Sequence, residues 1–140
     1  MGKSRYEPLV KFKKKALDSA ERALIAANNA LSAASDKLNR AYEELSHMRL
    51  PPKGSIGEFT QVAAMIRIQH QSIEGAKDEL RSAQQQQFLM REEFKAAMID
   101  YEKFKYLEMQ EMNLHLKEMK DQEAKMVDEI GTMTYKRGAI

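Results

Sequence analysis

The chain has 140 residues, of which 31% are charged, and its formal net charge of +2 at pH 7 provides no general basic surface for nucleic acid. It contains no cysteine, which excludes disulfides and thiolate metal sites and fits a reducing compartment. No apolar run approaches the length of a membrane span, and the N-terminus carries no signal-peptide stretch, so we expect a cytoplasmic protein.

The first third of the chain has a heptad pattern of large and small apolar residues. The large residues recur every seven positions, and an alanine follows most of them after three, giving Val10, Leu17, Leu24, Leu31, Leu38 and Leu45 with Ala20, Ala27, Ala34 and Ala41. Such a seam is typical of a helix in a coiled coil. Because proline is tolerated in the first turn of a helix, Pro8 places the start close by, and the pattern predicts a helix over about 6–48.

A break follows, with Pro51, Pro52, Gly54 and Gly57 close together. The prolines stop a helix and the glycines permit a reversal, which predicts a loop over 49–57. A second apolar seam then begins at Phe59 and continues in alternating steps of three and four residues to Phe104. The helical pattern continues past this seam, so we expect a second helix over about 58–136.

The two seams match when the second helix folds back along the first. If position numbers of facing residues sum to 107, Ala34 faces Ile73 and Leu31 faces Ala76, so large residues face small ones as a close-packed core requires. The sequence therefore predicts an all-α fold, a two-helix antiparallel coiled-coil hairpin, with residues 1–140 forming a single unit.

This register leaves the end of the second helix without a partner. The first helix starts near Tyr6, which lies opposite Tyr101, so the second helix has no partner beyond this point. Roughly thirty residues therefore form a C-terminal helical overhang on the order of 50 Å long. The overhang carries its own apolar stripe, here called the methionine stripe, of Met109, Met112, Leu116, Met119, Met126, Ile130 and Met133, with Glu123 in the same row. The seam changes phase near Glu108, which directs this stripe away from the first helix. It is covered either by another protein or by the overhang of a second copy.

Two further surfaces are candidates for binding partners. Exposed aromatic and apolar residues near the hairpin tip are candidate recognition anchors, namely Tyr42, Met65 and Ile68. A basic run near the N-terminus consists of Lys11, Lys13, Lys14 and Lys15. It is a solvated helix end or a docking site for an acidic protein surface; binding of nucleic acid or membrane is a third alternative, which the few stacking aromatics nearby disfavour.

We find no pattern that indicates catalysis. Glu44 and His47 have the Glu-x-x-His spacing of di-iron helical bundles, but such a site needs a second copy of the motif and more helices than two. A two-helix hairpin also has no enclosed cavity in which to hold a substrate. We therefore expect no enzyme activity, no metal site and no cofactor.

The chain resembles the FliJ family of flagellar type III export proteins. The resemblance rests on three segments and on the length and hairpin topology: Leu9-Val10-Lys11-Phe12 with the heptads that follow, residues 101–108 (YEKFKYLE), and residues 126–130 (MVDEI). Stalk proteins of the injectisome branch of secretion systems have a similar pattern.

The resemblance implies a central stalk without catalysis of its own. Family members insert the end of the hairpin that carries both termini into the ring of the export ATPase FliI, and they contact the export-gate protein FlhA. The resemblance also implies export chaperones as further partners and a location at the inner-membrane export apparatus. The adaptable methionine stripe suits the ATPase contact, and the patch of Tyr42, Met65 and Ile68 suits the gate contact. Two alternatives stay open, a structural coiled-coil protein that dimerises through the overhang and a helical-hairpin chaperone that holds unfolded clients.

Overall fold

Two long helices make up nearly all of the structure. The computed structural model describes residues 4–138, and within this range the chain forms α1 (Glu7–Ser46) and α2 (Ile56–Gly138) and no strand. This confirms the all-α prediction, and both helices begin and end within two residues of the predicted bounds. Neither helix, over the described residues, contains a stretch that is both long and apolar enough to cross a membrane.

Local side-chain hydrogen bonds explain where the helices start. At α2, the hydroxyl of Ser55 accepts a hydrogen bond from the backbone N–H of Glu58 at 3.2 Å, so Ser55 is the N-cap. Serine followed three residues later by glutamate is the capping-box pattern, which explains a start two residues earlier than predicted. Before α1, the hydroxyl of Ser4 accepts from the N–H of Tyr6 and its carbonyl accepts from the N–H of Glu7.

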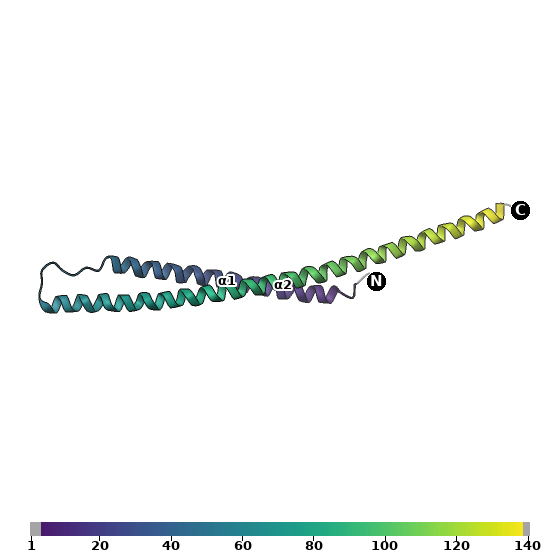
Figure 1. The fold of residues 1–140 in the computed structure, drawn as a ribbon. Coiled ribbons are helices and arrows are strands. Elements are labelled where there is room, and N and C mark those ends of the chain that lie inside the picture. Colours follow the sequence, from purple (N-terminus) through teal and green to yellow (C-terminus); the bar gives the residue numbers. More distant parts are fainter. Residues whose placement is uncertain (1–3, 139–140) are drawn as a thin grey trace. The chain divides into compact units, whose positions relative to one another are not determined.

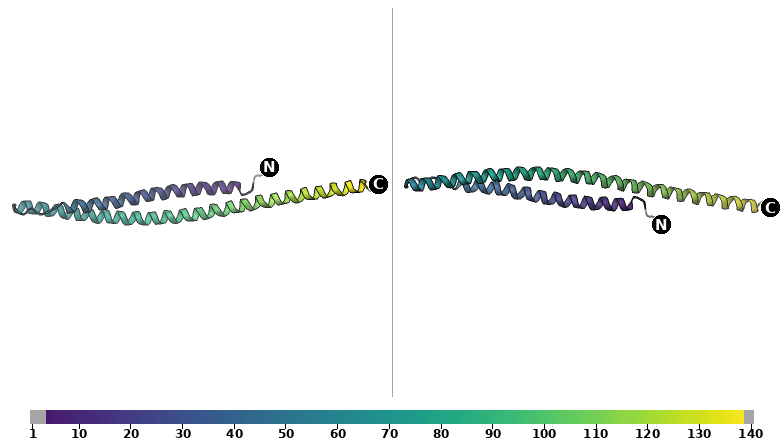
Figure 2. Two further views of the ribbon diagram at one scale, coloured as in Figure 1. Left: turned by 90° about the horizontal axis from the view of Figure 1, so that it is seen from above. Right: turned by 90° about the horizontal axis from the view of Figure 1, so that it is seen from below.

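The chain divides into two compact units, each an antiparallel helix pair. One unit is Asp18–Ala96, in which α1 and the first part of α2 form a hairpin closed by residues 47–55. The other consists of Met1–Leu17 and Ala97–Ile140, in which the start of α1 lies beside α2 and α2 then continues alone. The two views of Figure 2 likewise show the helices of each pair side by side.

Each pair has a narrow apolar core. The buried apolar residues are Ala27, Ala41, Ile73 and Ala76 in the hairpin unit and Leu17 in the other unit. Leu24 and Leu31, which the sequence places at the centre of the seam, are only half-buried. Since two helices cannot enclose a side chain completely, stability depends on many partly buried layers.

The predicted register is wrong by about one heptad. A sum of 107 puts Lys37 opposite His70 and Lys13 opposite Phe94. In the structure the Lys37 ammonium instead lies 2.9 Å from the carboxylate of Glu79, and that of Lys13 lies 3.3 Å from the carboxylate of Asp100. These contacts correspond to a register seven residues later, in which Ala41 faces Ile73 and Leu31 faces Ala83.

The loop explains the difference. The seams repeat every seven residues, so a shift of one heptad again places large residues opposite small ones, and apolar pattern alone does not distinguish the registers. Residues 47–55 are not a tight turn but run past the first turns of α2 (Figure 1). In the observed register the end of α1, Ser46, faces Ile68, which is twelve residues or about 18 Å into α2. The loop has to span this distance. Because Pro51 and Pro52 favour extended backbone, its nine residues reach about 30 Å, which is enough.

The later register also shortens the unpaired end of α2. The hydroxyl of Ser4 donates to Glu111 at 2.9 Å, whereas in the expected register Ser4 would face Lys103. The overhang is therefore residues 112–138, about 40 Å at 1.5 Å per residue. Every residue in it is exposed.

Candidate functional site

The methionine stripe is a row of exposed apolar side chains on the unpaired end of α2 and the residues just before it. All seven apolar members, Met109, Met112, Leu116, Met119, Met126, Ile130 and Met133, are between 46% and 61% exposed. They follow one another at helical spacing, so they form one row along α2, which only Glu123 interrupts between Met119 and Met126. Single exposed apolar residues are ordinary, whereas a row of this length on an unpaired helix is a candidate binding surface.

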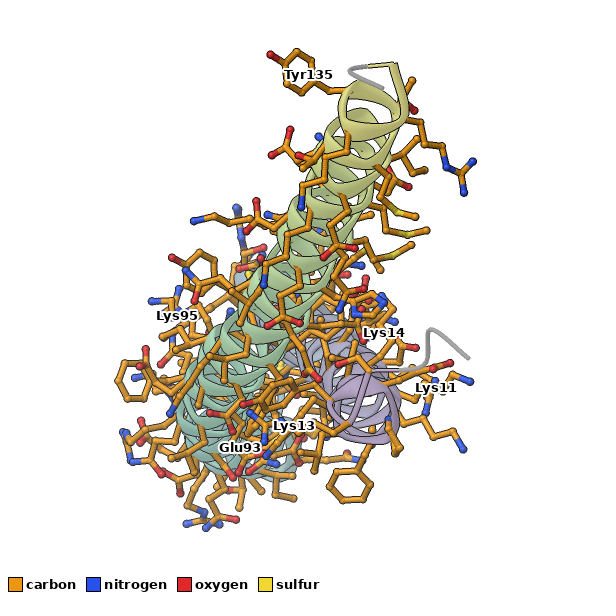
Figure 3. The ribbon with its side chains drawn as sticks, turned by 90° about the vertical axis from the view of Figure 1, so that its right-hand side faces the viewer. Lys11, Lys13, Lys14, Glu93, Lys95 and Tyr135 are labelled. Atoms are coloured by element: carbon orange, nitrogen blue, oxygen red, sulfur yellow. The ribbon has the colours of Figure 1, made fainter. Side chains whose placement is uncertain are left out.

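The stripe faces a different direction from the side of α2 that contacts α1. That contacting side is half-buried at Phe104, Glu108 and Glu111, in steps of four and three residues. Met109 and Met112 each lie one residue further along, which turns them by about 100° around the helix. In Figure 3 the sulfur atoms near the C-terminus lie along one side of α2, and Tyr135 points to another. The predicted change of phase thus falls where α1 begins.

The residues near the hairpin tip are exposed but lie on two sides of the helix pair. The Lys77 ammonium lies 5.9 Å from the centre of the Tyr42 ring, and the Tyr42 hydroxyl and then Glu74 raise the pKa of Lys77 above its usual value. Glu79 follows Lys77 by two residues, which turns it by about 200° around α2. Glu79 therefore faces the side opposite to Lys77. Met65 and Ile68 precede Glu79 by fourteen and eleven residues, which places them on its side of α2. The structure therefore separates Tyr42 from Met65 and Ile68.

The lysines of the basic run differ in whether they contact α2. The Lys13 ammonium lies 5.6 Å from the centre of the Phe104 ring in addition to its contact with Asp100, and that of Lys14 lies 5.5 Å from the Tyr101 ring. Figure 3 shows Lys13 on the side of α1 that faces α2. Lys11 lies 3.3 Å from Glu7, one turn away on α1, and Lys15 is exposed. Lys13 and Lys14 thus help to join the two helices.

Two polar residues that the sequence reasoning did not use connect the helices. Gln69, in the seam, is buried and donates from Nε2 to the carbonyl oxygen of Ala41 at 2.9 Å and to Glu44 at 3.3 Å. Glu111 accepts from Ser4 and lies 3.7 Å from the guanidinium of Arg5. The sequence does contain a signal for this contact, because Gln69 is a polar residue at a seam position, and such residues often select one register among several.

The structure offers no metal cluster in its described residues. Within residues 4–138 no three histidine, aspartate or glutamate side chains are grouped so that they could hold an ion. Glu44 accepts the hydrogen bond from Gln69, and His47 lies beyond the end of α1. The hollow at the start of α1, about 380 Å³ and open to solvent, is lined by Ser4, Arg5, Glu111, Met112, Leu114, His115 and Glu118.

The helix pairs, the uncovered stripe and the exposed tip residues define a coiled-coil protein with candidate binding surfaces. The model of the family described as "Flagellar FliJ protein" matches residues 2–139, and the chain therefore belongs to the FliJ family. This makes it a protein of flagellar export, from a family that is structural and not known as catalytic. No curated protein and no solved structure gives a match.

Proposed function

We propose that this FliJ-family protein is a non-catalytic stalk and adaptor of the flagellar type III export apparatus. It binds the ring of the export ATPase FliI through the methionine stripe and the export-gate protein FlhA through residues near the hairpin tip. It acts in the cytoplasm, at the periphery of the inner-membrane export apparatus. The observation that carries the proposal is the overhang, whose apolar row is exposed along its whole described length.

The composition of the stripe suits insertion into a ring. A helix on the axis of a ring meets several subunits in different orientations, so one surface has to fit several slightly different ones. Five of the seven apolar members of the stripe are methionines, whose flexible, polarisable side chains adapt to irregular surfaces. Further partners of the same complex, including export chaperones, can use the sides of the helix that remain exposed.

Charge substitutions in the stripe test the ATPase contact. Met119→Glu and Ile130→Glu each place a carboxylate in the row, and we expect either to abolish co-sedimentation with the purified ATPase. Tyr135→Glu is the matched control, because it makes a similar change on another side of the overhang (Figure 3) and should leave binding intact. Circular dichroism should show equal helix content for all three. Unchanged binding by both stripe variants would refute the assignment.

The gate contact needs variants on both sides of the hairpin. Ile68→Glu changes the side that carries Met65, and Tyr42→Ala changes the side that carries Lys77. We expect at least one of them to weaken binding to the gate protein, measured by titration calorimetry, while ATPase binding stays at the wild-type level. Gate affinity that neither variant changes would exclude Tyr42, Met65 and Ile68 as contacts.

We assign electrostatic docking to the exposed lysines of the basic run. Lys11 and Lys15 lie on the surface of α1, whereas Lys13 and Lys14 contact α2. Because interactions between exposed charges are screened by salt, Lys15→Glu should slow association most at low ionic strength. An association rate that Lys15→Glu does not change at low salt would argue against docking there.

A further inference from the structure

The methionine stripe is uncovered in the single chain, although a lone helix of this length gains little stability in water. A helix in a protein is stabilised mainly by packing of its apolar face, and no residue of the overhang is packed in the single chain. A chain that has not yet met its partners in the export apparatus therefore presents a long apolar row to solvent.

We propose that a second copy of this chain covers the row, and that the two overhangs pair as an antiparallel coiled coil. The pairing follows from the heptad positions of the stripe. Met112, Met119, Met126 and Met133 occupy one seam position, and Met109, Leu116, Glu123 and Ile130 occupy the other. In an antiparallel pair each residue of the first set faces one of the second set in the partner copy.

One register uses the whole stripe. If Met119 faces Glu123 of the partner copy, then Leu116 faces Met126, Met112 faces Ile130 and Met109 faces Met133. A shift by one heptad leaves either the first two or the last two members of the stripe unpaired. The register centred on Met119 and Glu123 therefore buries the most apolar surface, which is the main source of association free energy.

Charges beside the stripe favour the same register. In an antiparallel coiled coil, each heptad position that flanks the seam pairs with the same heptad position of the other helix. This places Glu108 beside Lys136 of the partner copy and His115 beside Glu129 of the partner copy. The two-fold symmetry of such a dimer repeats both pairs. The two copies of Lys120 approach each other near the axis, and each lies one turn from the Glu123 of its own helix.

The parallel arrangement lacks these advantages. In a parallel pair aligned in register, each seam residue faces its own copy, so two Glu123 carboxylates would meet inside the seam. The flanking contacts would then join His115 to Lys120 and Glu129 to Thr134, and none would pair opposite charges. Like charges brought together at an interface oppose association.

The start of α1 leaves room for a second copy. It contacts the side of α2 that carries Phe104, Glu108 and Glu111, and the stripe is turned from that side by about 100°, so that Glu108 borders both the contact with α1 and the stripe. A hollow of about 400 Å³, lined by Ser4, Glu7, Val10, Lys11, Glu108 and Met112, lies between the two helices at this point. The C-terminal end of the partner's overhang would pass beside this hollow.

Sedimentation equilibrium and cysteine cross-linking test the dimer. The mass should rise from 16.1 kDa towards twice that value with concentration. Since the chain has no cysteine, single-cysteine variants report the orientation. Gln122 faces itself in the antiparallel register, so Gln122→Cys should form a disulfide-linked dimer, whereas Met112→Cys should not, because its two copies lie about 27 Å apart. Cross-linking of Met112→Cys alone, or a monomeric mass at every concentration, would overturn the proposal.

A charge swap tests the register. Glu108→Lys and Lys136→Glu each create like-charged pairs, and each should raise the dimer dissociation constant about three- to tenfold. The double variant restores opposite charges, and its constant should return to near the wild-type value. A double variant that is weaker than either single variant would contradict the register. All of these measurements use the chain without the ATPase, so their outcome does not depend on the proposed stalk function, although both partners would compete for the stripe.

Discussion

Gln69 donates a hydrogen bond from its side-chain amide to the backbone carbonyl oxygen of Ala41, at 2.9 Å, across the apolar seam of the hairpin. Gln69 is buried, and the same nitrogen also lies 3.3 Å from a carboxylate oxygen of Glu44. In the register expected from the seams, Gln69 would face Leu38, and Ala34 and Lys37 would take the places of Ala41 and Glu44 beside it. This contact therefore distinguishes the observed register from the one expected.

The register can be measured directly because the chain has no cysteine. In the observed register Ala34 faces Leu80, whereas in the expected one it faces Ile73. We expect the double variant Ala34→Cys/Leu80→Cys to form an intramolecular disulfide under mild oxidation, and Ala34→Cys/Ile73→Cys to stay reduced. Preferential oxidation of the second pair would mean that the hairpin adopts the earlier register in solution.

Replacing Gln69 by leucine should separate stability from register. A buried polar residue replaced by an apolar one of similar volume often changes the free energy of unfolding little, so we expect a change within about 1 kcal/mol. The register preference should weaken, and the Ala34→Cys/Ile73→Cys pair should then oxidise to a measurable extent in the Gln69→Leu background. If that pair stays fully reduced, the loop and ion pairs determine the register without Gln69.

Ile73 is the largest apolar side chain among the buried residues of the hairpin unit, with 3% of its surface exposed. Ile73→Ala should lower the free energy of unfolding by about 2–4 kcal/mol, through lost apolar burial and the cavity that remains. Urea denaturation followed by circular dichroism measures this. Ile68→Ala is the control, because Ile68 is 62% exposed and its truncation should cost no more than about 0.5 kcal/mol.

Two adjacent positions on α2 should respond in opposite directions to an added side chain. Ala76 is 2% exposed, so Ala76→Leu should force the helices apart and cost about 1–3 kcal/mol. A β-carbon at Gly75 would meet no atom within 4 Å, so Gly75→Ala should stabilise the helix by about 0.5–1 kcal/mol. Thermal unfolding midpoints should shift down for the first variant and up for the second. A lower unfolding midpoint for Gly75→Ala would mean that the added methyl group meets another molecule, such as a second copy of the chain, at this site.

Glu111 joins the start of the chain to α2 through Ser4 and Arg5. We expect Glu111→Ala to increase amide hydrogen exchange in the first turns of α1 and to leave exchange around Ile73 unchanged, since local opening at a helix end need not affect a distant core. Glu129→Ala, five turns beyond Glu111 on the exposed end of α2, is the matched control. Equal exchange in both variants would show that the Glu111 contacts do not hold the start of α1.

The candidate sites were predictable from sequence to different degrees. The stripe from Met109 to Met133 follows from helical spacing alone, because residues three and four apart share one side of a helix in any context. The separation of Tyr42 from Met65 and Ile68 did not follow, since it depends on which side of each helix faces the other. The role of Lys13 in the contact between the helices was likewise hidden, because a lysine in a basic run has the pattern of an exposed residue.

Sequence by itself determined the two helices, their bounds to within two residues, and the unpaired end of α2, because heptad spacing, Pro8 and the Pro51-Pro52 break act locally. Only the tertiary structure decided the register. The energy of the Leu and Ala layers is nearly unchanged by a shift of seven residues, so the outcome depends on an extended loop and on cross-helix contacts such as Gln69 with Ala41 and Lys37 with Glu79. Those contacts join residues far apart in the chain, and no local pattern contains them.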